Sequence, residues 1–410
     1  KLKDYNGHYC ESEYENAFLG FLEKAGWTYT AGNALPRASR HEVLLEADFK
    51  EFLKENAPDL TAGEIDQLYD TVHLAGGESD FATLHKLYGW MVFGIQFVPQ
   101  NGLARMVPLI NFEEPGKNIF RAVNQFVVEY TNNGQKETRR PDVLLFVNGM
   151  PLCVIELKNP AAANATIHDA WEQITIRYWR DIPHLLHYCP LACISDGVKT
   201  RLGTVRTPYE HFYAWRRVED GDKISALPFA ETETLINGVY SPARFLEIFR
   251  DYIYFQDSIY DSSEVEIVCR YPQFFAARLL KQSIIRSVVE KSGKGGTYFG
   301  ATGCGKTYTM AFLARQLALR CTGIKEIGSP TIIMIVDRDD LQKQGSKLFT
   351  KSKDFLNLGE VQVVRSRNAL RQELGMRESG GFYICTIQKF CDREDDKIGL
   401  INNRANIICF

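Results

Sequence analysis

The feature of the sequence that most constrains the fold is the pattern G-x-x-x-x-G-K-[ST], which residues 300–307 match in full as GATGCGKT. This pattern is typical of a glycine-rich loop that joins a strand to a helix. Apolar strand-like segments alternate with helical ones around it: helix 272–291, strand 297–299, a helix from 305, and strands 331–336, 361–364, 382–386 and 406–410. The alternation predicts an α/β unit with a parallel sheet over residues 262–410.

The residues of this loop have a specific phosphate chemistry. Glycines let backbone N–H groups approach phosphate oxygens, and the N-terminus of the following helix adds positive potential there. Lys306 is placed to reach the β and γ phosphates, and the Thr307 hydroxyl is placed to bind Mg²⁺. The alternative is a glycine turn that binds nothing, which the flanking strand and helix disfavour. We therefore expect ATP and Mg²⁺ as cofactors, with loop contacts from Thr302, Gly303, Cys304, Gly305, Lys306 and Thr307.

The first 240 residues follow a different pattern. It predicts helices at 12–25, 46–57, 62–73, 79–91 and 168–180, and strands at 93–98, 105–112, 123–130, 142–147, 152–157, 191–195 and 211–215. Ser12 and Glu15 are spaced as a capping box for the first helix, and Asn148-Gly149 suits a tight hairpin turn. We predict a mixed sheet flanked by helices in residues 1–240. A connecting helix (241–256) and linker would then occupy residues 241–261.

Composition narrows the class of protein. The chain has 410 residues, of which 45% are hydrophobic, enough for two or three domains with their own cores. The sequence contains no apolar run long enough to cross a membrane, so we expect a soluble intracellular protein with its ten cysteines reduced. The net charge of −3 argues against a histone-like polycation but leaves DNA binding open.

Asp142, Glu156 and Lys158 form the pattern P-D-x13-E-x-K across the expected hairpin. Two carboxylates can hold Mg²⁺, which polarises a phosphate and activates a water. Lys158 can position that water or stabilise the developing negative charge. Glu156 and Lys158 share one face of their strand, and Asp142 can face them from the partner strand. A solvated Glu–Lys pair is the alternative, but this pair ends a strongly apolar strand, where charges are costly.

Further polar residues accompany this pattern. Gln173, Arg177 and Arg180 are spaced to share one helix face, from which they could contact DNA phosphates or brace the site. A plain amphipathic surface explains the two arginines equally well. Glu15 could supply an additional metal-binding carboxylate, although its place in the capping box explains it equally well.

The segments Arg140–Asp142 and Glu156–Pro160 closely resemble the nuclease domain of type I restriction (R, or HsdR) subunits. That domain belongs to the PD-(D/E)xK group and is similar to RecB-family nucleases. Further matches are Asp169–Ile174, Arg177-Tyr178 and Ser195–Gly197. The resemblance implies a RecB-like fold and places Gln173 with the catalytic residues. RecB-type nucleases usually show Q-x-x-x-Y, whereas Tyr178 lies five positions after Gln173, which leaves the role of Tyr178 open.

The second unit resembles the first RecA-like lobe of superfamily-two helicases and translocases. Their phosphate loop commonly reads Gly-Ser-Gly-Lys-Thr, and Cys304 replaces the serine here. Gln273 resembles their adenine-reading glutamine, with a plain helix-surface residue as the alternative. Residues 406–410 resemble the strand that leads to an Asp-Glu-Ala-His segment, which would follow Phe410. The resemblance therefore implies that the isolated chain hydrolyses little ATP.

Together these resemblances imply the restriction subunit of a type I restriction-modification complex. Such a subunit couples ATP-dependent translocation of double-stranded DNA to Mg²⁺-dependent endonucleolytic cleavage of unmodified DNA. The implied partners are a methyltransferase subunit and a specificity subunit, in the cytoplasm of a bacterium or archaeon. Two other functions stay open: a stand-alone DNA-repair helicase-nuclease, and a non-catalytic DNA- or nucleotide-binding module.

Overall fold

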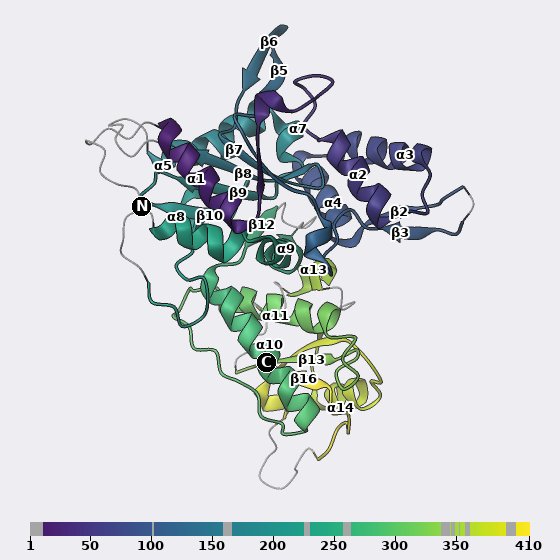
Figure 1. Ribbon diagram of the computed structural model, residues 1–410. Coiled ribbons are helices and arrows are strands. Elements are labelled where there is room, and N and C mark those ends of the chain that lie inside the picture. Colours follow the sequence, from purple (N-terminus) through teal and green to yellow (C-terminus); the bar gives the residue numbers. More distant parts are fainter. Residues whose placement is uncertain are drawn as a thin grey trace. The chain divides into compact units, whose positions relative to one another are not determined.

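The structure is a computed structural model. It describes residues 11–100, 102–158, 166–224, 230–256, 264–337, 345, 349–351, 353–356, 361–390 and 399–410. The described chain divides into two compact units (Figure 1). The first contains the described residues up to Ile253 together with Glu266–Val268, and the second contains those of 254–265 and Cys269–Phe410.

The first unit is built on a six-stranded mixed sheet in the order β1-β4-β7-β8-β9-β10. Its strands are β1 (Thr28–Ala31), β4 (Phe120–Asn124), β7 (Val143–Val147), β8 (Met150–Leu157), β9 (Leu191–Ser195) and β10 (Thr200–Thr204). The pairs β1/β4 and β8/β9 are parallel, and the other neighbours are antiparallel. Every residue of β7, β8 and β9 is buried, as expected for strands covered on both faces. The predicted mixed sheet is confirmed.

Helices cover this sheet (Figure 1). They are α1 (Glu11–Ala25), α2 (Glu46–Asn56), α3 (Ala62–His73), α4 (Asp80–Phe93), α5 (Ile167–Glu172), a π-helical turn (Gln173–Tyr178), α6 (Trp179–Asp181), α7 (Pro183–Leu186), α8 (Ala230–Leu235), a second π-helical turn (Ile236–Tyr240) and α9 (Pro242–Asp251). In α1 the side chains of Phe18 and Leu22, on the apolar face of the helix, are fully buried. Gly26 follows the helix with a φ of 113°, which suits the residue that ends a helix.

Three predictions for the first unit were wrong in detail. The strand expected at 123–130 is interrupted at Gln125, whose φ is 50°, and β5 (Val128–Asn132) then pairs with β6 (Gln135–Arg139) as a separate hairpin. Residues 211–215 contribute only an isolated bridge through Tyr213, and β10 forms the edge strand instead. The helix expected over 241–256 ends at Asp251 and is followed by β11 (Ile253–Gln256), which pairs with β12 (Val265–Val268). A small hairpin of β2 (Ile95–Phe97) and β3 (Arg105–Val107) also belongs to this unit.

The second unit contains a four-stranded parallel sheet in the order β14-β15-β13-β16. Its elements are α10 (Tyr271–Glu290), α11 (Lys306–Arg320), β13 (Thr331–Val336), α13 (Lys353–Leu356), β14 (Val361–Val363), α14 (Arg367–Gly375), β15 (Phe382–Thr386) and β16 (Ile407–Cys409). The predicted parallel sheet is confirmed. The strand expected at 297–299 is not, because these residues pair with no described strand and Phe299 is 94% exposed.

No helix within the described ranges is both long enough and apolar enough to cross a membrane.

Candidate active site

The β7–β8 hairpin carries the acidic residues of the candidate site. Asn148 and Gly149 form its two-residue turn with φ values of 51° and 78°, as the sequence predicted. Glycine is required at position 149 for two reasons: its φ is positive, and a Cβ there would lie 2.2 Å from the Leu45 carbonyl oxygen. The turn therefore fixes where the two strands begin to pair.

A β-bulge decides which side chains meet across this hairpin. An unbroken ladder starting from Val147 and Met150 would place Asp142 opposite Ile155, on the face away from Glu156. The structure skips Leu152, so that Val143 pairs with Ile155. Extending this register by one residue places Asp142 opposite Glu156, in agreement with the hydrogen bond from the Leu157 N–H to Asp142. Because side chains alternate between faces, this one extra residue brings Asp142, Glu156 and Lys158 to the same face.

Asp142 is held rigidly at the end of β7. Its side chain is 8% exposed, and its Oδ2 accepts a 2.8 Å hydrogen bond from the backbone N–H of Leu157. Its carbonyl oxygen accepts another, of 2.9 Å, from the Gln125 N–H. The preceding Pro141 restricts the backbone further.

Glu156 is a fully buried carboxylate at the centre of the sheet. Its Oε1 accepts a 2.5 Å hydrogen bond from the Tyr178 hydroxyl, and its Oε2 accepts none from any described residue. Lys158 Nζ lies 3.8 Å from Oε2. Burial, and then the neighbouring negative charge of Asp142, raise the pKa of Glu156 well above its usual range. A divalent cation between these carboxylates would offset both effects, so the residues present fit such an ion.

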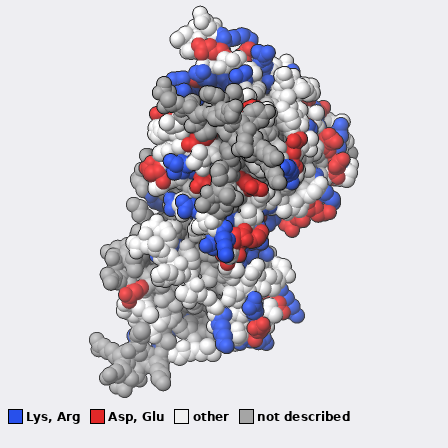
Figure 2. Space-filling view, turned by 60° about the vertical axis from the view of Figure 1, so that its left-hand side comes forward, with Lys and Arg blue, Asp and Glu red and all other residues white. Residues whose placement is uncertain are grey.

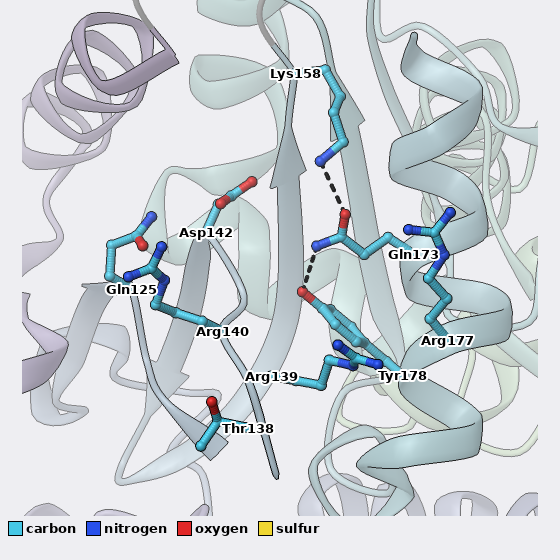
Figure 3. A pocket seen from close by; sticks show the side chains of 9 residues that line it. All are labelled: Gln125, Thr138, Arg139, Arg140, Asp142, Lys158, Gln173, Arg177 and Tyr178. Atoms are coloured by element: carbon cyan, nitrogen blue, oxygen red, sulfur yellow. Dashed lines mark hydrogen bonds between the residues drawn. The ribbon is translucent and has the colours of Figure 1, made fainter. Parts of the chain in front are cut away.

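A chain of hydrogen bonds links Lys158 back to Glu156, and Figure 3 shows its first two links, from Lys158 to Gln173 and from Gln173 to Tyr178. Lys158 Nζ donates to Gln173 Oε1 at 3.0 Å, Gln173 Nε2 donates to the Tyr178 hydroxyl at 2.8 Å, and that hydroxyl donates to Glu156. Residues 173–178 form a π-helical turn, in which backbone hydrogen bonds join residues five rather than four positions apart. This turn therefore brings Gln173 and Tyr178 together although they are five positions apart, the spacing that had left the role of Tyr178 open. The unusual spacing in the sequence was itself a sign of the π-helical turn.

Glu15 lies near this site but is held by amides. Its side chain is 8% exposed and accepts 2.6 Å hydrogen bonds from Asn124 Nδ2 and Gln125 Nε2. The predicted capping box was wrong, because Ser12 lies inside α1 and Glu15 turns to the end of β4. Among the described residues, no three His, Cys, Asp or Glu side chains are grouped closely enough to hold a metal together. A metal-binding role for Glu15 stays a prediction.

The site opens into a polar cavity of about 340 Å³ (Figure 3). Its lining consists of Gln125, Thr138, Arg139, Arg140, Asp142, Lys158, Gln173, Arg177 and Tyr178. Four cations against one carboxylate make this lining suitable for a phosphate backbone. Of the helix-face arginines that the sequence singled out, Arg177 lines the cavity, whereas Arg180 does not and instead binds Asp181 at 2.7 Å.

Four lining residues were not predicted from their own pattern: Gln125, Thr138, Arg139 and Arg140. They come from the ends of β4 and β6, next to Asp142 in space or in sequence. Arg140 begins a segment that resembles the nuclease domain, but for the other three proximity to Asp142 was the only available signal, and it could not distinguish lining residues from exposed strand ends.

The second candidate site is the phosphate loop before α11. Gly303 and Gly305 have φ values of 78° and 83°, which only glycine adopts readily, and Gly305 caps the helix. Lys306 Nζ donates to the carbonyl oxygens of Gly300 and Ala301, at 2.8 and 3.0 Å. Thr302 and Gly303 are exposed, whereas Thr307 is half-buried in the first turn of α11.

Gln273 reaches this loop from the first turn of α10. It is 4% exposed, and its Nε2 donates to the carbonyl oxygens of Cys304 (3.4 Å) and Gly305 (3.1 Å), while its Oε1 accepts from the Arg270 N–H. The structure therefore brings Gln273 and the loop together, with the amide bracing the backbone. Adenine reading by Gln273 stays a prediction. Cys304 is half-buried with its Sγ 3.9 Å from the Tyr298 hydroxyl.

Comparison with known proteins gives two family matches. Residues 8–211 match the family described as type I restriction enzyme R protein N terminus, and residues 272–410 match the SWI2/SNF2 ATPase family. The chain is 31% identical, over 97% of its length, to the type I restriction enzyme HindI endonuclease subunit of Haemophilus influenzae. It is 29% identical, over 96% of its length, to the putative type I restriction enzyme MjaIXP endonuclease subunit of Methanocaldococcus jannaschii. The chain spans 38% and 39% of the length of these two relatives.

Proposed function

The chain belongs, through residues 8–211, to the type I restriction enzyme R protein family, and we propose that it works as the restriction subunit of such an enzyme. In this proposal it couples ATP-dependent translocation of double-stranded DNA to Mg²⁺-dependent endonucleolytic cleavage of unmodified DNA. The observation that carries the cleavage half is the buried Glu156, whose Oε2 lacks a hydrogen-bond donor among the described residues while Asp142 stands opposite.

The nuclease half is proposed to be a RecB-like PD-(D/E)xK domain over residues 1–240. Asp142 and Glu156 would hold Mg²⁺, with water and phosphate oxygens completing its shell. Mg²⁺ is commonly held by only one or two carboxylates in this way, so no third acidic side chain is needed. When bound, the ion supplies Lewis-acid polarisation of the phosphate and of the attacking water.

The protein's own residues then have distinct roles in cleavage. Lys158 lies at the cavity wall, where its ammonium group can position the attacking water and stabilise the negative charge that develops on the phosphate. Gln173 fixes the direction of that ammonium group by accepting one of its hydrogen bonds. Tyr178 orients Glu156 by donating to Oε1, which leaves Oε2 available to the ion. Gln173 and Tyr178 therefore act as positioning residues.

The second half is proposed to be the first RecA-like lobe of the translocase, over residues 262–410, joined by the segment 241–261. Lys306 would bind the β and γ phosphates of ATP, and Thr307 would contribute its hydroxyl to the accompanying Mg²⁺. Backbone N–H groups at Thr302–Gly305 would cradle the phosphates. The glycine conformations and the match to the SWI2/SNF2 ATPase family support this assignment.

Target recognition is proposed to reside in other subunits. The relatives are named as endonuclease subunits, which points to an assembly with further subunits. We propose a methyltransferase subunit and a specificity subunit as those partners. With DNA as substrate, and with relatives from a bacterium and an archaeon, the expected place of action is the cytoplasm of such an organism.

The test is plasmid cleavage by the assembled complex, with Lys158→Ala and Lys306→Ala compared with the unaltered subunit. We expect Lys158→Ala to abolish cutting while ATP hydrolysis continues, and Lys306→Ala to abolish ATP hydrolysis. Cutting by Lys158→Ala at the normal rate would refute the nuclease site. ATP-driven cutting of methylated and unmethylated plasmids alike, without a methyltransferase, would instead indicate a repair helicase-nuclease.

A further inference from the structure

The β5–β6 hairpin leaves the central sheet beside Asp142. The last pair between β4 and β7 is Asn124–Val143, and the first pair of the hairpin is Val128–Arg139. Strand β5 therefore extends β4, and β6 extends β7. Asp142 lies in the short connection between β6 and β7. In Figure 1 the hairpin projects away from the sheet. A molecule that rests against the hairpin is thus held at a fixed distance from Asp142.

The hairpin is braced by its own side chains. Both of its acidic residues are engaged: Lys136 binds Glu129 at 2.7 Å, and the Tyr130 hydroxyl donates to Glu137 at 2.6 Å. Asn133 and Gly134 form its turn, with φ values of 49° and 79°. These contacts make the hairpin a preorganised two-stranded ribbon, a shape that the major groove of B-form DNA admits.

The surface chemistry of this hairpin suits nucleic acid rather than protein. The exposed residues at its tip, 131–136, are Thr, Asn, Asn, Gly, Gln and Lys, and none of the large apolar side chains of the described segment 128–140 is exposed. The β2–β3 hairpin of the same unit has the opposite character, with Val98, Leu103 and Met106 exposed. Amide, hydroxyl and ammonium groups contact DNA backbones, whereas apolar and aromatic groups are enriched at protein interfaces.

Arg140, at the base of the hairpin, differs from the other arginines of the cavity. Arg139 binds Asp181 at 2.6 Å, and Arg177 lies 3.6 Å from Glu172. Arg140 is exposed and forms no ion pair or hydrogen bond with any residue in the described part of the chain. Figure 3 shows it beside Gln125 and Asp142, across the cavity from Gln173 and Arg177. Its charge is therefore available to a ligand entering the cavity.

We propose that the β5–β6 hairpin and Arg140 form the surface that positions duplex DNA for cleavage. The hairpin lies along a groove of the duplex. Arg140 binds a phosphate next to the one that is cleaved beside Asp142 and Glu156. Figure 2 shows Lys and Arg side chains, with a few acidic ones among them, gathered near the top of the view, at the height of the hairpin in Figure 1. This inference rests on the proposed nuclease function and adds the element that places the substrate.

The test is equilibrium binding of the chain to a labelled 30-base-pair duplex in EDTA, which separates binding from cutting. Each phosphate contact contributes about 0.9 to the slope of log affinity against log salt concentration. We expect Arg140→Ala to reduce the magnitude of this slope by about 1 and to lower affinity about tenfold at low salt. Arg140→Lys should keep the slope, because it keeps the charge. Arg105→Ala on β3, which removes an exposed arginine from the other hairpin, should also keep it.

A second variant tests the ribbon itself. Gln135→Glu adds one negative charge to the exposed face of β6 with little change in shape, and we expect it to weaken binding several-fold. Gln96→Glu, at an exposed position of β2, is the matched control and should leave affinity unchanged. Thermal unfolding of each variant shows whether the fold is kept.

The outcomes separate this inference from the proposed function. If Arg140→Ala and Gln135→Glu bind the duplex like the unaltered chain, or if that chain does not bind it, the DNA surface is refuted while the nuclease site stands. If binding responds as expected but the assembled enzyme never cuts with Mg²⁺, the nuclease proposal fails and the surface stands.

Discussion

The two candidate sites have opposite electrostatic states without their ligands. In the cavity of the first unit, two carboxylates face each other in a buried sheet, and Glu156 Oε2 accepts no hydrogen bond from the described residues. In the phosphate loop of the second unit, the cation is already engaged, because Lys306 donates to two carbonyl oxygens. Gln273 donates to two more carbonyl oxygens of the same loop.

This difference predicts how each site responds to its ligand. Burial and the nearby Asp142 disfavour the ionised form of Glu156, so a cation that binds this carboxylate should stabilise the first unit. A phosphate that binds the loop must first displace Lys306 from Gly300 and Ala301, so part of its binding energy replaces contacts that already exist. The first site therefore gains electrostatic stabilisation from its ligand, whereas the second exchanges existing hydrogen bonds for new ones.

The largest expected effect follows from removing the buried charge. Glu156→Gln keeps the shape of the side chain but removes the carboxylate, and the charge stabilisation that the metal supplies amounts to several kcal/mol. We expect plasmid cleavage to fall at least about 10³-fold. In EDTA the same variant should unfold at a higher temperature than the unaltered chain, because the amide escapes the desolvation cost and the repulsion from Asp142 that raise the pKa of Glu156.

Added Mg²⁺ provides the control for this prediction. It should raise the unfolding temperature of the unaltered chain and leave that of Glu156→Gln unchanged. A variant that cleaves within tenfold of the normal rate, or that is stabilised equally by Mg²⁺, would show that Glu156 is not a metal ligand.

The second prediction addresses the loop. Lys306→Ala removes a charged hydrogen-bond donor worth roughly 1.5–3 kcal/mol, so ATP affinity should fall about 10- to 100-fold. Mg²⁺ stabilisation of the first unit should be unaffected, which keeps the two sites separable. Binding of a fluorescent ATP analogue is the measurement, and Lys325→Ala, an exposed lysine of the same unit, is the matched control. Equal loss in both variants would mean that general surface charge, rather than the loop, binds the nucleotide.

The third prediction concerns the π-helical turn. Tyr178→Phe removes the hydroxyl that links Gln173 to Glu156, a loss of about 1–1.5 kcal/mol, so cleavage should fall roughly tenfold. ATP affinity should not change. Tyr188→Phe is the control, since it removes another buried hydroxyl, one that donates to the Val72 carbonyl oxygen. If both variants lower cleavage equally, Tyr178 contributes only to stability.

The sequence alone was sufficient to predict the elements whose structure depends mainly on neighbouring residues. Helical periodicity predicted α1 to α4, and the Asn148-Gly149 pair predicted the hairpin, because both depend on neighbouring residues. The juxtaposition of Asp142 with Glu156 was predicted only as possible. Five residues lie between Asp142 and the turn but six lie between the turn and Glu156, so the two face each other only through a bulge, and Leu152 supplies it.

Tertiary contacts decided what the sequence could not show. Residues 297–299 have strand-like side chains, but a strand needs a neighbour for its hydrogen bonds, and none of the described strands pairs with it. Likewise, the sequence alone cannot tell the roles of the adjacent Arg139 and Arg140 apart. Both line the cavity, and only the position of Asp181, on a helix some 40 residues further along, makes Arg139 the paired one and leaves Arg140 without an ion pair among the described residues.

The last expected effect acts on stability rather than on cleavage: it is a pH response that the two units do not share. All eight histidines of the chain lie at or before residue 211, in the first unit. His184 stacks on His41 with ring centroids 4.3 Å apart, and its buried Nε2 has no hydrogen-bond partner among the described residues. Burial, and then the neighbouring His41 and His187, lower the pKa of His184 to about 4.

The sign of the effect follows from proton binding. In the unfolded chain the pKa of His184 should be about 6.5. Below that pH the unfolded state therefore binds more protons than the folded state. The stabilisation is present above about pH 6.5 and is lost as the pH falls towards 4, by about 1–2 kcal/mol after solvent screening. His184→Gln should remove this part of the acid sensitivity, measured as unfolding free energy at pH 7 and pH 5. If instead the second unit, which has no histidine, loses stability equally over this range, the buried imidazole is not the cause.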